Sequence, residues 1–225
     1  MSEIRSKVSL KGLNTFGIDV NCKFFSCFKN SDDLNAVFSH ELNEPLLILG
    51  GGSNLLFTKD FEGLVLKNEV LGKELLIDSD SDVLVKVGAG ENWHEFVMWC
   101  IDNNYGGLEN LSLIPGNVGA SPMQNIGAYG VEIKDLFDHL TAYNIETREL
   151  EVFDKKACKF GYRESVFKRK LKGKYIIMHV VYRLTKKHLI KTNYGAINAE
   201  LEKMQVKNPS IKDISNAVIN IRRSK

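Results

Sequence analysis

The sequence predicts an α+β fold made of two units, a small α/β unit in residues 1–70 and a larger α+β unit in residues 71–225. Three observations predict it. Short apolar runs of strand length mark the first unit, an alternating run from residue 83 leads into helical spacing, and strand patterns return after residue 137 before a final helix. A chain of 225 residues can bury a core in one large domain or two small ones.

The first unit contains a strand that ends in a glycine turn. Residues 45–49 (PLLIL) form a short apolar run that stops at the GGGSN sequence of residues 50–54. Such a run is typical of a buried strand followed by a tight turn. Residues 61–66 (FEGLVL) predict a second short strand.

The larger unit combines strands with two helices. Strand patterns occupy 83–88 (VLVKVG), 140–146 (LTAYNIE), 149–153 (ELEVF) and 175–184 (YIIMHVVYRL). Apolar residues repeat at helical spacing from Trp93 to Ile101, and this helix is expected to end before Gly106. Residues 210–225 predict a last helix, in which Ser210 and Asp213 have capping-box spacing.

Composition and charge exclude several classes of function. The net charge of +2 gives no electrostatic reason to expect a nucleic-acid partner, and the longest apolar runs are too short to span a bilayer. The N-terminus lacks the apolar stretch of a secretory signal. The four cysteines form no CxxC motif and have no histidine at ligand spacing, so we expect reduced thiols, no metal and a cytoplasmic protein. The basic run 167–174 (FKRKLKGK) is interpreted as a solvated hairpin end rather than an RNA site.

Two glycine-rich loops are the candidate binding elements. In residues 49–57 (LGGGSNLLF), successive backbone N–H groups can converge on an anion, although a lone GGG more often makes a structural turn. Residues 114–130 (IPGNVGASPMQNIGAYG) interleave small residues with amides and hydroxyls, as a planar ligand lying on backbone requires. The alternative for this segment is a structural Ω-loop. Together the loops are compatible with one extended ligand that carries a diphosphate and a ring system.

Four motifs carry a family resemblance. GGGSNLLF, GAGENWHEFV, GLENLSLIPGNVGASPMQNIGAYGVE and FGYRESVF together resemble the UDP-N-acetylenolpyruvoylglucosamine reductases, and the similarity runs from about residue 12 to residue 225. The resemblance implies an FAD-binding fold of the vanillyl-alcohol-oxidase/PCMH type, with the flavin between two α/β subdomains. The cofactor-binding residues that it implies are Gly50, Gly51, Gly52, Ser53, Asn54, Pro115, Gly116, Gly119, Ala120, Ser121, Pro122, Gln124, Asn125, Ile126, Gly127 and Tyr129. Neither loop holds a His or Cys, so we expect the FAD to be non-covalent.

The resemblance also implies a reaction of peptidoglycan precursor synthesis, and hence a role in cell wall biogenesis, cell shape and cell division. NADPH reduces FAD, and the reduced flavin passes a hydride to the enolpyruvyl double bond of a UDP-sugar. Arg163 matches the active-site arginine, whose planar cation suits the carboxylate on which charge develops. Tyr194 and Lys225 match substrate-binding residues. Their alternatives are a surface ion pair, a half-buried tyrosine and a solvated helix end.

The sequence departs from the family pattern in one large respect. In the family, a further domain carries a glycine-serine-phenylalanine-phenylalanine motif whose serine protonates the enol, and a glutamate that assists. Neither can be assigned here, so we expect an FAD-binding part with impaired turnover, present as a truncated product, a chosen fragment or a remnant. A non-catalytic flavin-binding fragment and another oxidoreductase of the same fold are the alternatives. We expect a monomer with a small-molecule substrate and no nucleic-acid or membrane partner.

Overall fold

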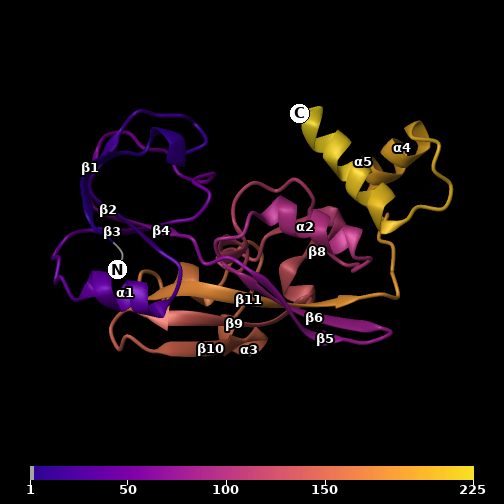
Figure 1. The fold of residues 1–225 in the computed structure, drawn as a ribbon. Coiled ribbons are helices and arrows are strands. Elements are labelled where there is room, and N and C mark those ends of the chain that lie inside the picture. Colours follow the sequence, from indigo (N-terminus) through magenta and orange to yellow (C-terminus); the bar gives the residue numbers. More distant parts are fainter. Residues whose placement is uncertain (1–2) are drawn as a thin grey trace.

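Two β-sheets form the frame of the protein in the computed structural model, which describes residues 3–225 (Figure 1). The first sheet has the order β1-β2-β4-β3, with β1 antiparallel to β2 and the other pairs parallel. Its strands are β1 (Arg5–Ser9), β2 (Asn21–Phe28), β3 (Leu46–Leu49) and β4 (Phe61–Asn68). Helix α1 (Ser31–Phe38) links β2 to β3, and a short 3-10 turn, η1 (Lys11–Leu13), links β1 to β2.

The first sheet is buried on both faces because successive side chains of a strand point to opposite sides. In β4, Leu64 and Leu66 pack with α1, whereas Val65 packs with Leu49 in a second cluster on the other side of the sheet. This double burial explains why β3 and β4 were predictable as apolar runs. The strands β1 and β2 and the helix α1 were not predicted, because their apolar residues are diluted by exposed polar ones.

The second sheet is antiparallel throughout and has the order β10-β9-β11-β6-β5. Its strands are β5 (Lys73–Asp78), β6 (Asp82–Gly88), β9 (Phe137–Asn144), β10 (Leu150–Asp154) and β11 (Tyr175–Thr185). The longest strand, β11, lies at the centre, and its predicted extent of 175–184 is confirmed to within one residue. Helix α2 (Trp93–Asp102) packs on the sheet through Trp93, Phe96 and the buried Tyr182.

The two sheets share part of one core. Tyr143, Ile176 and Met178 of the second sheet belong to the same buried cluster as Phe28 of the first sheet and Leu34 of α1. The hydroxyl of Tyr143 donates to Asn35 Oδ1 at 2.7 Å, so a polar contact also joins the second sheet to α1. This shared cluster fixes the position of the loop after β3 relative to the second sheet.

A helix pair completes the chain and lies on the same side of the second sheet as α2 (Figure 1). Helices α4 (Gly195–Lys203) and α5 (Ile211–Arg223) bury a small core of their own. The predicted capping box is confirmed, with the Ser210 and Asp213 side chains each bonded to the other's backbone. Helix α4 was not predicted.

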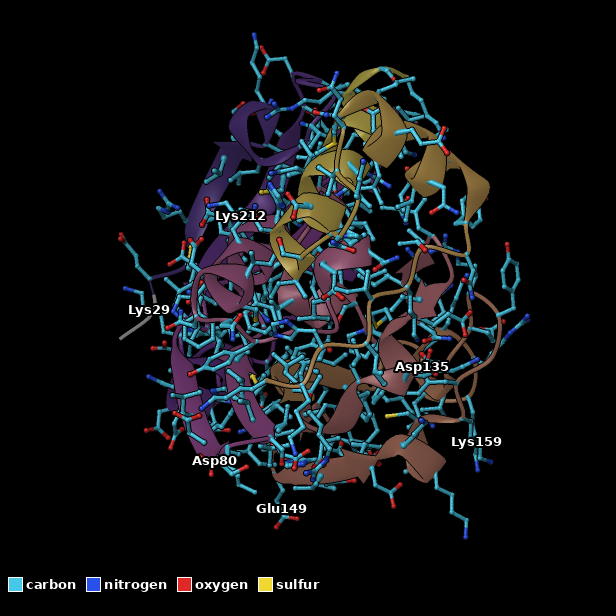
Figure 2. The ribbon with its side chains drawn as sticks, turned by 90° about the vertical axis from the view of Figure 1, so that its right-hand side faces the viewer. Lys29, Asp80, Asp135, Glu149, Lys159 and Lys212 are labelled. Atoms are coloured by element: carbon cyan, nitrogen blue, oxygen red, sulfur yellow. The ribbon has the colours of Figure 1, made fainter. Side chains whose placement is uncertain are left out.

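The prediction for the basic run 167–174 is confirmed in part: its basic residues are exposed, but the segment is not the end of a hairpin. A 3-10 turn, η5 (Val166–Lys168), and successive turns lead into β11, which pairs with β9 and β6 and not with the preceding strand β10. The segment therefore crosses over rather than closing a hairpin, and Phe167 anchors it in the core. Along residues 3–225, no helix is long and apolar enough to cross a membrane. Figure 2 shows charged side chains of both signs, such as Asp80, Glu149 and Lys159, at the periphery and directed away from the core.

Candidate functional site: two adjoining cavities

The two glycine-rich loops lie against each other. A Cβ built on Gly51 would stand 3.0 Å from Gly116 Cα and 2.6 Å from Asn117 Oδ1. A Cβ on Gly50 would stand 3.7 Å from Asn117 Cβ. The loop after β3 therefore lies against the backbone of Gly116 and the side chain of Asn117, which leave no room for a side chain at Gly51.

Close packing also demands glycine at the turn itself. Gly52 has a left-handed φ of 64°, and a Cβ there would stand 2.0 Å from the carbonyl oxygen of Leu13. In the second loop, a Cβ on Gly119 would stand 2.6 Å from Ala89 Cβ. These glycines are required by the fold whether or not a ligand is present, and they leave the loop backbone uncovered.

A cavity of about 310 Å³ lies between the loops. Of the predicted cofactor residues it is lined by Gly50, Gly51, Gly52, Ser53, Asn54, Pro115, Gly116, Ala120, Ser121, Gln124 and Ile126. Glycine backbone forms one side, and apolar side chains including Ile48, Ile114 and Met123 form much of the rest. This fits FAD, because uncovered backbone N–H groups suit a diphosphate and an apolar wall suits a flat ring system.

Several predicted residues support the second loop from behind. The Ser121 hydroxyl is buried and lies 2.6 Å from the Tyr182 hydroxyl. Asn125 is also buried, donates to Gly161 O at 2.9 Å and accepts from the backbone N–H of Lys134. Ser121 lines the cavity, whereas Asn125, Gly119 and the buried Pro122 do not. These side chains shape the loop, which leaves its backbone to face the cavity.

A second cavity of about 380 Å³ adjoins the first and brings together the residues predicted for catalysis and substrate binding. Arg163, Tyr194 and Lys225 all line it, together with Tyr129 and Gly127. The rings of Tyr129 and Tyr194 meet edge to face at 5.4 Å between centroids. Ile114 lines both cavities, so the start of the second loop, residues 114–130, is their common wall.

Arg163 is held by the second loop. Its Nη2 donates to Gly127 O at 2.7 Å, and its backbone has a left-handed φ of 53°, which is unusual for a side chain of this size. Arg163, Arg222 and Lys225 make the second cavity cationic, and no described residue that lines it is acidic. The cavity is therefore suited to a ligand with several negative charges.

Sequence reasoning missed four residues at the site. The Asn117 side chain lies against Gly51 of the first loop and donates to Gly90 O, and Lys67 Nζ donates to Gly50 O behind the first loop. Burial lowers the pKa of Lys67. Lys168 lines the first cavity, although it belongs to the basic run interpreted as solvated, and Arg222 lines the second. Arg222 lies in the last turn of α5, three residues before the predicted Lys225, so its closeness to Lys225 in the sequence was the available signal.

Comparison with known proteins agrees with the geometry. The FAD binding domain family matches residues 23–151. The chain is 53% identical over 224 residues to a UDP-N-acetylenolpyruvoylglucosamine reductase of Flavobacterium johnsoniae, and 47% identical to one of Amoebophilus asiaticus. In both comparisons the match covers 99% of this chain and 66% of the relative, so the chain spans just under two thirds of the relatives' length.

Solved structures confirm the predicted fold type. The crystal structure of the reductase from Thermus caldophilus superimposes with a TM-score of 0.68 at 20% identity, covering 100% of this chain and 70% of that one. p-Cresol methylhydroxylase superimposes with a TM-score of 0.50 at 10% identity, covering 73% of this chain and 36% of that one. At such identities the likeness concerns the fold alone, which is the vanillyl-alcohol-oxidase/PCMH FAD-binding fold.

Proposed function

We propose, because this chain belongs to the FAD binding domain family and matches reductases along 99% of its length, that its two cavities hold FAD and a UDP-sugar side by side. The first cavity takes the flavin non-covalently, with the 50–54 loop at the diphosphate and the 114–130 loop along the ring. The second takes UDP-N-acetylenolpyruvoylglucosamine, which is reduced with NADPH to UDP-N-acetylmuramate. The observation that carries the proposal is the shared wall at Ile114, which separates an uncovered glycine backbone from a cationic cavity.

The residues of the chain supply binding and charge. When bound, FAD accepts a hydride and delivers it to a carbon of the substrate. Arg163 provides a fixed cation for the substrate carboxylate, on which negative charge grows during the transfer, so it stabilises the transition state more than the ground state. Its bond to Gly127 O joins this cation to the loop that lies along the flavin. One segment of chain would therefore set the distance between the carbon or nitrogen that gives up the hydride and the substrate carbon that receives it.

Arg222 and Lys225 face the remaining charge of the substrate. Both line the second cavity on the side formed by α5, and a UDP-sugar carries its diphosphate away from the enolpyruvyl group. Three cations in one cavity, Arg163, Arg222 and Lys225, suit a substrate that carries both a carboxylate and a diphosphate. The Tyr129 and Tyr194 rings add an apolar surface for the sugar or the uracil.

A second function, flavin binding without turnover, is favoured by one observation. Reduction of the double bond needs a proton donor, and the described residues lining the second cavity offer the Tyr129 and Tyr194 hydroxyls and the Lys225 ammonium but no serine or acidic side chain, the types expected in this role. We therefore expect the 225-residue chain to bind FAD and to show little NADPH-dependent reduction of the enolpyruvyl substrate.

Titration of the purified chain with FAD tests the proposal. We expect stoichiometric uptake with quenching or shift of the flavin spectrum, release of intact FAD on denaturation, and a further spectral change when the UDP-sugar is added. A chain that takes up no FAD overturns the assignment of the first cavity. A chain that binds FAD but gives no spectral response to the UDP-sugar, over a range where UDP alone is also silent, overturns the assignment of the second.

A further inference from the structure

The backbone of Leu113 is hydrogen-bonded at both its N–H and its carbonyl group, by side chains from two different helices. Its backbone N–H donates to Nδ1 of His94, on α2, at 3.0 Å. Its carbonyl oxygen accepts from Nε of Arg222, on α5, at 3.0 Å. Leu113 also has a left-handed φ of 56°, which is unfavourable for a leucine and persists only where the surroundings impose it.

Leu113 lies at a point where a change in its backbone conformation affects both cavities. Leu113 directly precedes Ile114, the wall shared by the two cavities, and the rigid Pro115. A change of backbone conformation at Leu113 therefore rotates the start of the second loop relative to both cavities. The preceding residue is fixed as well, because the buried Ser112 hydroxyl lies 2.7 Å from that of Ser215 on α5.

We propose that His94 and Arg222 are positioning residues, which hold Leu113 in its left-handed conformation and so place Ile114 at the boundary between the flavin and substrate cavities. The proposal rests on the proposed function of these cavities. His94 touches neither cavity, and it acts only through the Leu113 peptide. Arg222 also lines the second cavity. A ligand bound there can therefore act, through Arg222 and Leu113, on Ile114 in the wall of the first cavity.

The bond from Leu113 to His94 requires one protonation state. Nδ1 accepts a hydrogen bond only in the neutral imidazole that carries its proton on Nε2, and protonation converts Nδ1 into a donor that opposes the Leu113 N–H. The charged groups around the ring act in both directions: Arg223 on α5 lowers the pKa and Glu95 on α2 raises it. Burial lowers the pKa of His94 more than either, so the net shift is downward from 6.5.

The sign of the pH effect follows from this shift. A histidine whose pKa is lower in the folded protein favours the native arrangement at neutral pH and loses that contribution as pH falls through the folded value. The acceptor at Nδ1 is thus intact above pH 6.5 and is lost in more acidic solution. Acid should loosen Leu113 and weaken the binding of FAD.

Two variants of His94 test the idea. His94→Asn keeps an acceptor near the place of Nδ1 but cannot titrate, whereas His94→Leu removes the acceptor. FAD dissociation constants are measured by flavin fluorescence from pH 5 to 8, and hydrogen exchange of the amides of residues 112–114 and 116 is measured without FAD. We expect H94L to bind FAD about 10-fold more weakly than the unaltered chain at pH 7.5, equivalent to about 1.4 kcal/mol. We expect H94N to match the unaltered chain at pH 7.5 and to bind about 10-fold more tightly than it at pH 5.

Hydrogen exchange provides a readout that does not depend on the flavin. The Leu113 amide should exchange about 10-fold faster in H94L than in H94N at pH 7.5, while the amides of β11 stay unchanged. Arg222→Lys, which keeps a donor, should retain more FAD affinity than Arg222→Met.

The outcomes separate the two claims. Failure of the unaltered chain to bind FAD refutes the proposed function, and equal exchange of the Leu113 amide in H94L and H94N refutes the positioning role on its own. If H94L does not fold, an H94N chain whose FAD affinity falls with acid as steeply as that of the unaltered chain is sufficient to overturn the inference.

Discussion

Replacement of Gly52 by alanine should separate the conformational role of the first loop from its steric role. Gly52 is buried, has a φ of 64°, and is braced by the 13–15 segment, whose Thr15 N–H donates to Gly52 O at 3.3 Å. The new Cβ would stand 2.0 Å from Leu13 O and 2.9 Å from Leu13 C. Both atoms are backbone, so they cannot rotate away, and the loop itself must move.

Two control glycines allow the magnitude to be worked out. Gly17 has a φ of 63° and an added Cβ there meets nothing within 4 Å, so G17A measures the left-handed conformation alone, about 1–2 kcal/mol. Gly50 has neither a positive φ nor a contact closer than 3.7 Å, so G50A should change stability by less than about 1 kcal/mol. G52A adds a steric overlap of about 1–3 kcal/mol to the conformational cost, which gives about 2–5 kcal/mol in total.

The assay is urea unfolding of the three variants, followed by FAD titration of each folded variant. We expect the free energy of unfolding to fall in the order G50A, G17A, G52A, and FAD affinity to fall at least 10-fold in G52A while G17A keeps the affinity of the unaltered chain. G17A is the informative comparison because it lies outside the cavity. If G52A and G17A lose the same stability and the same affinity, the contact with Leu13 does not shape the loop and the reasoning fails.

Three further predictions concern single side chains. Arg163→Met should weaken binding of the enolpyruvyl substrate about 10- to 100-fold, seen as loss of the flavin spectral change, while FAD affinity stays within about 2-fold; Arg163→Lys should lie between. Ser121→Ala should destabilise the fold by about 1–3 kcal/mol, because it leaves the buried Tyr182 hydroxyl without a partner, and adding Tyr182→Phe should recover part of the loss in urea unfolding. Burial raises the pKa of Glu109, so the folded state binds this proton more tightly and stability falls as pH rises past the normal value; Glu109→Gln should flatten that slope between pH 4 and 7.

The parts of the fold that the sequence predicted are those with one dominant physical signal. Strand β11 is buried along almost its whole length at the centre of the sheet, so its apolar run is continuous. Edge strands lack this signal. In β5, Leu75, Leu76 and Ile77 are consecutive apolar residues, and each is between 42% and 44% exposed. They therefore lack the alternation of buried and exposed side chains by which a strand is predicted.

Sequence motifs indicated which loops form the candidate site, but they did not predict what each side chain contacts. Ser121 and Asn125 belong to the motif, but their polar groups point to Tyr182, Gly161 and Lys134. A sequence shows a polar residue without its partner, and two of the partners here, Tyr182 and Gly161, lie 61 and 36 residues further along the chain. Lys168 was missed for the opposite reason, because the surrounding basic run is exposed and resembles a solvated surface.

The second loop is rich in small residues and is nevertheless firmly fixed. Buried hydrogen bonds hold it at Ser121 and Asn125, and the buried Asn110 amide donates to Tyr129 O at 3.0 Å. The same short segment lines the first cavity at Gly116 and the second at Gly127. Under the proposed function, the flavin and the substrate would both lie on this segment, which would fix the separation of the two carbons between which the hydride passes. Small residues bring the backbone close to each ligand, and the buried polar groups supply the rigidity that glycine removes.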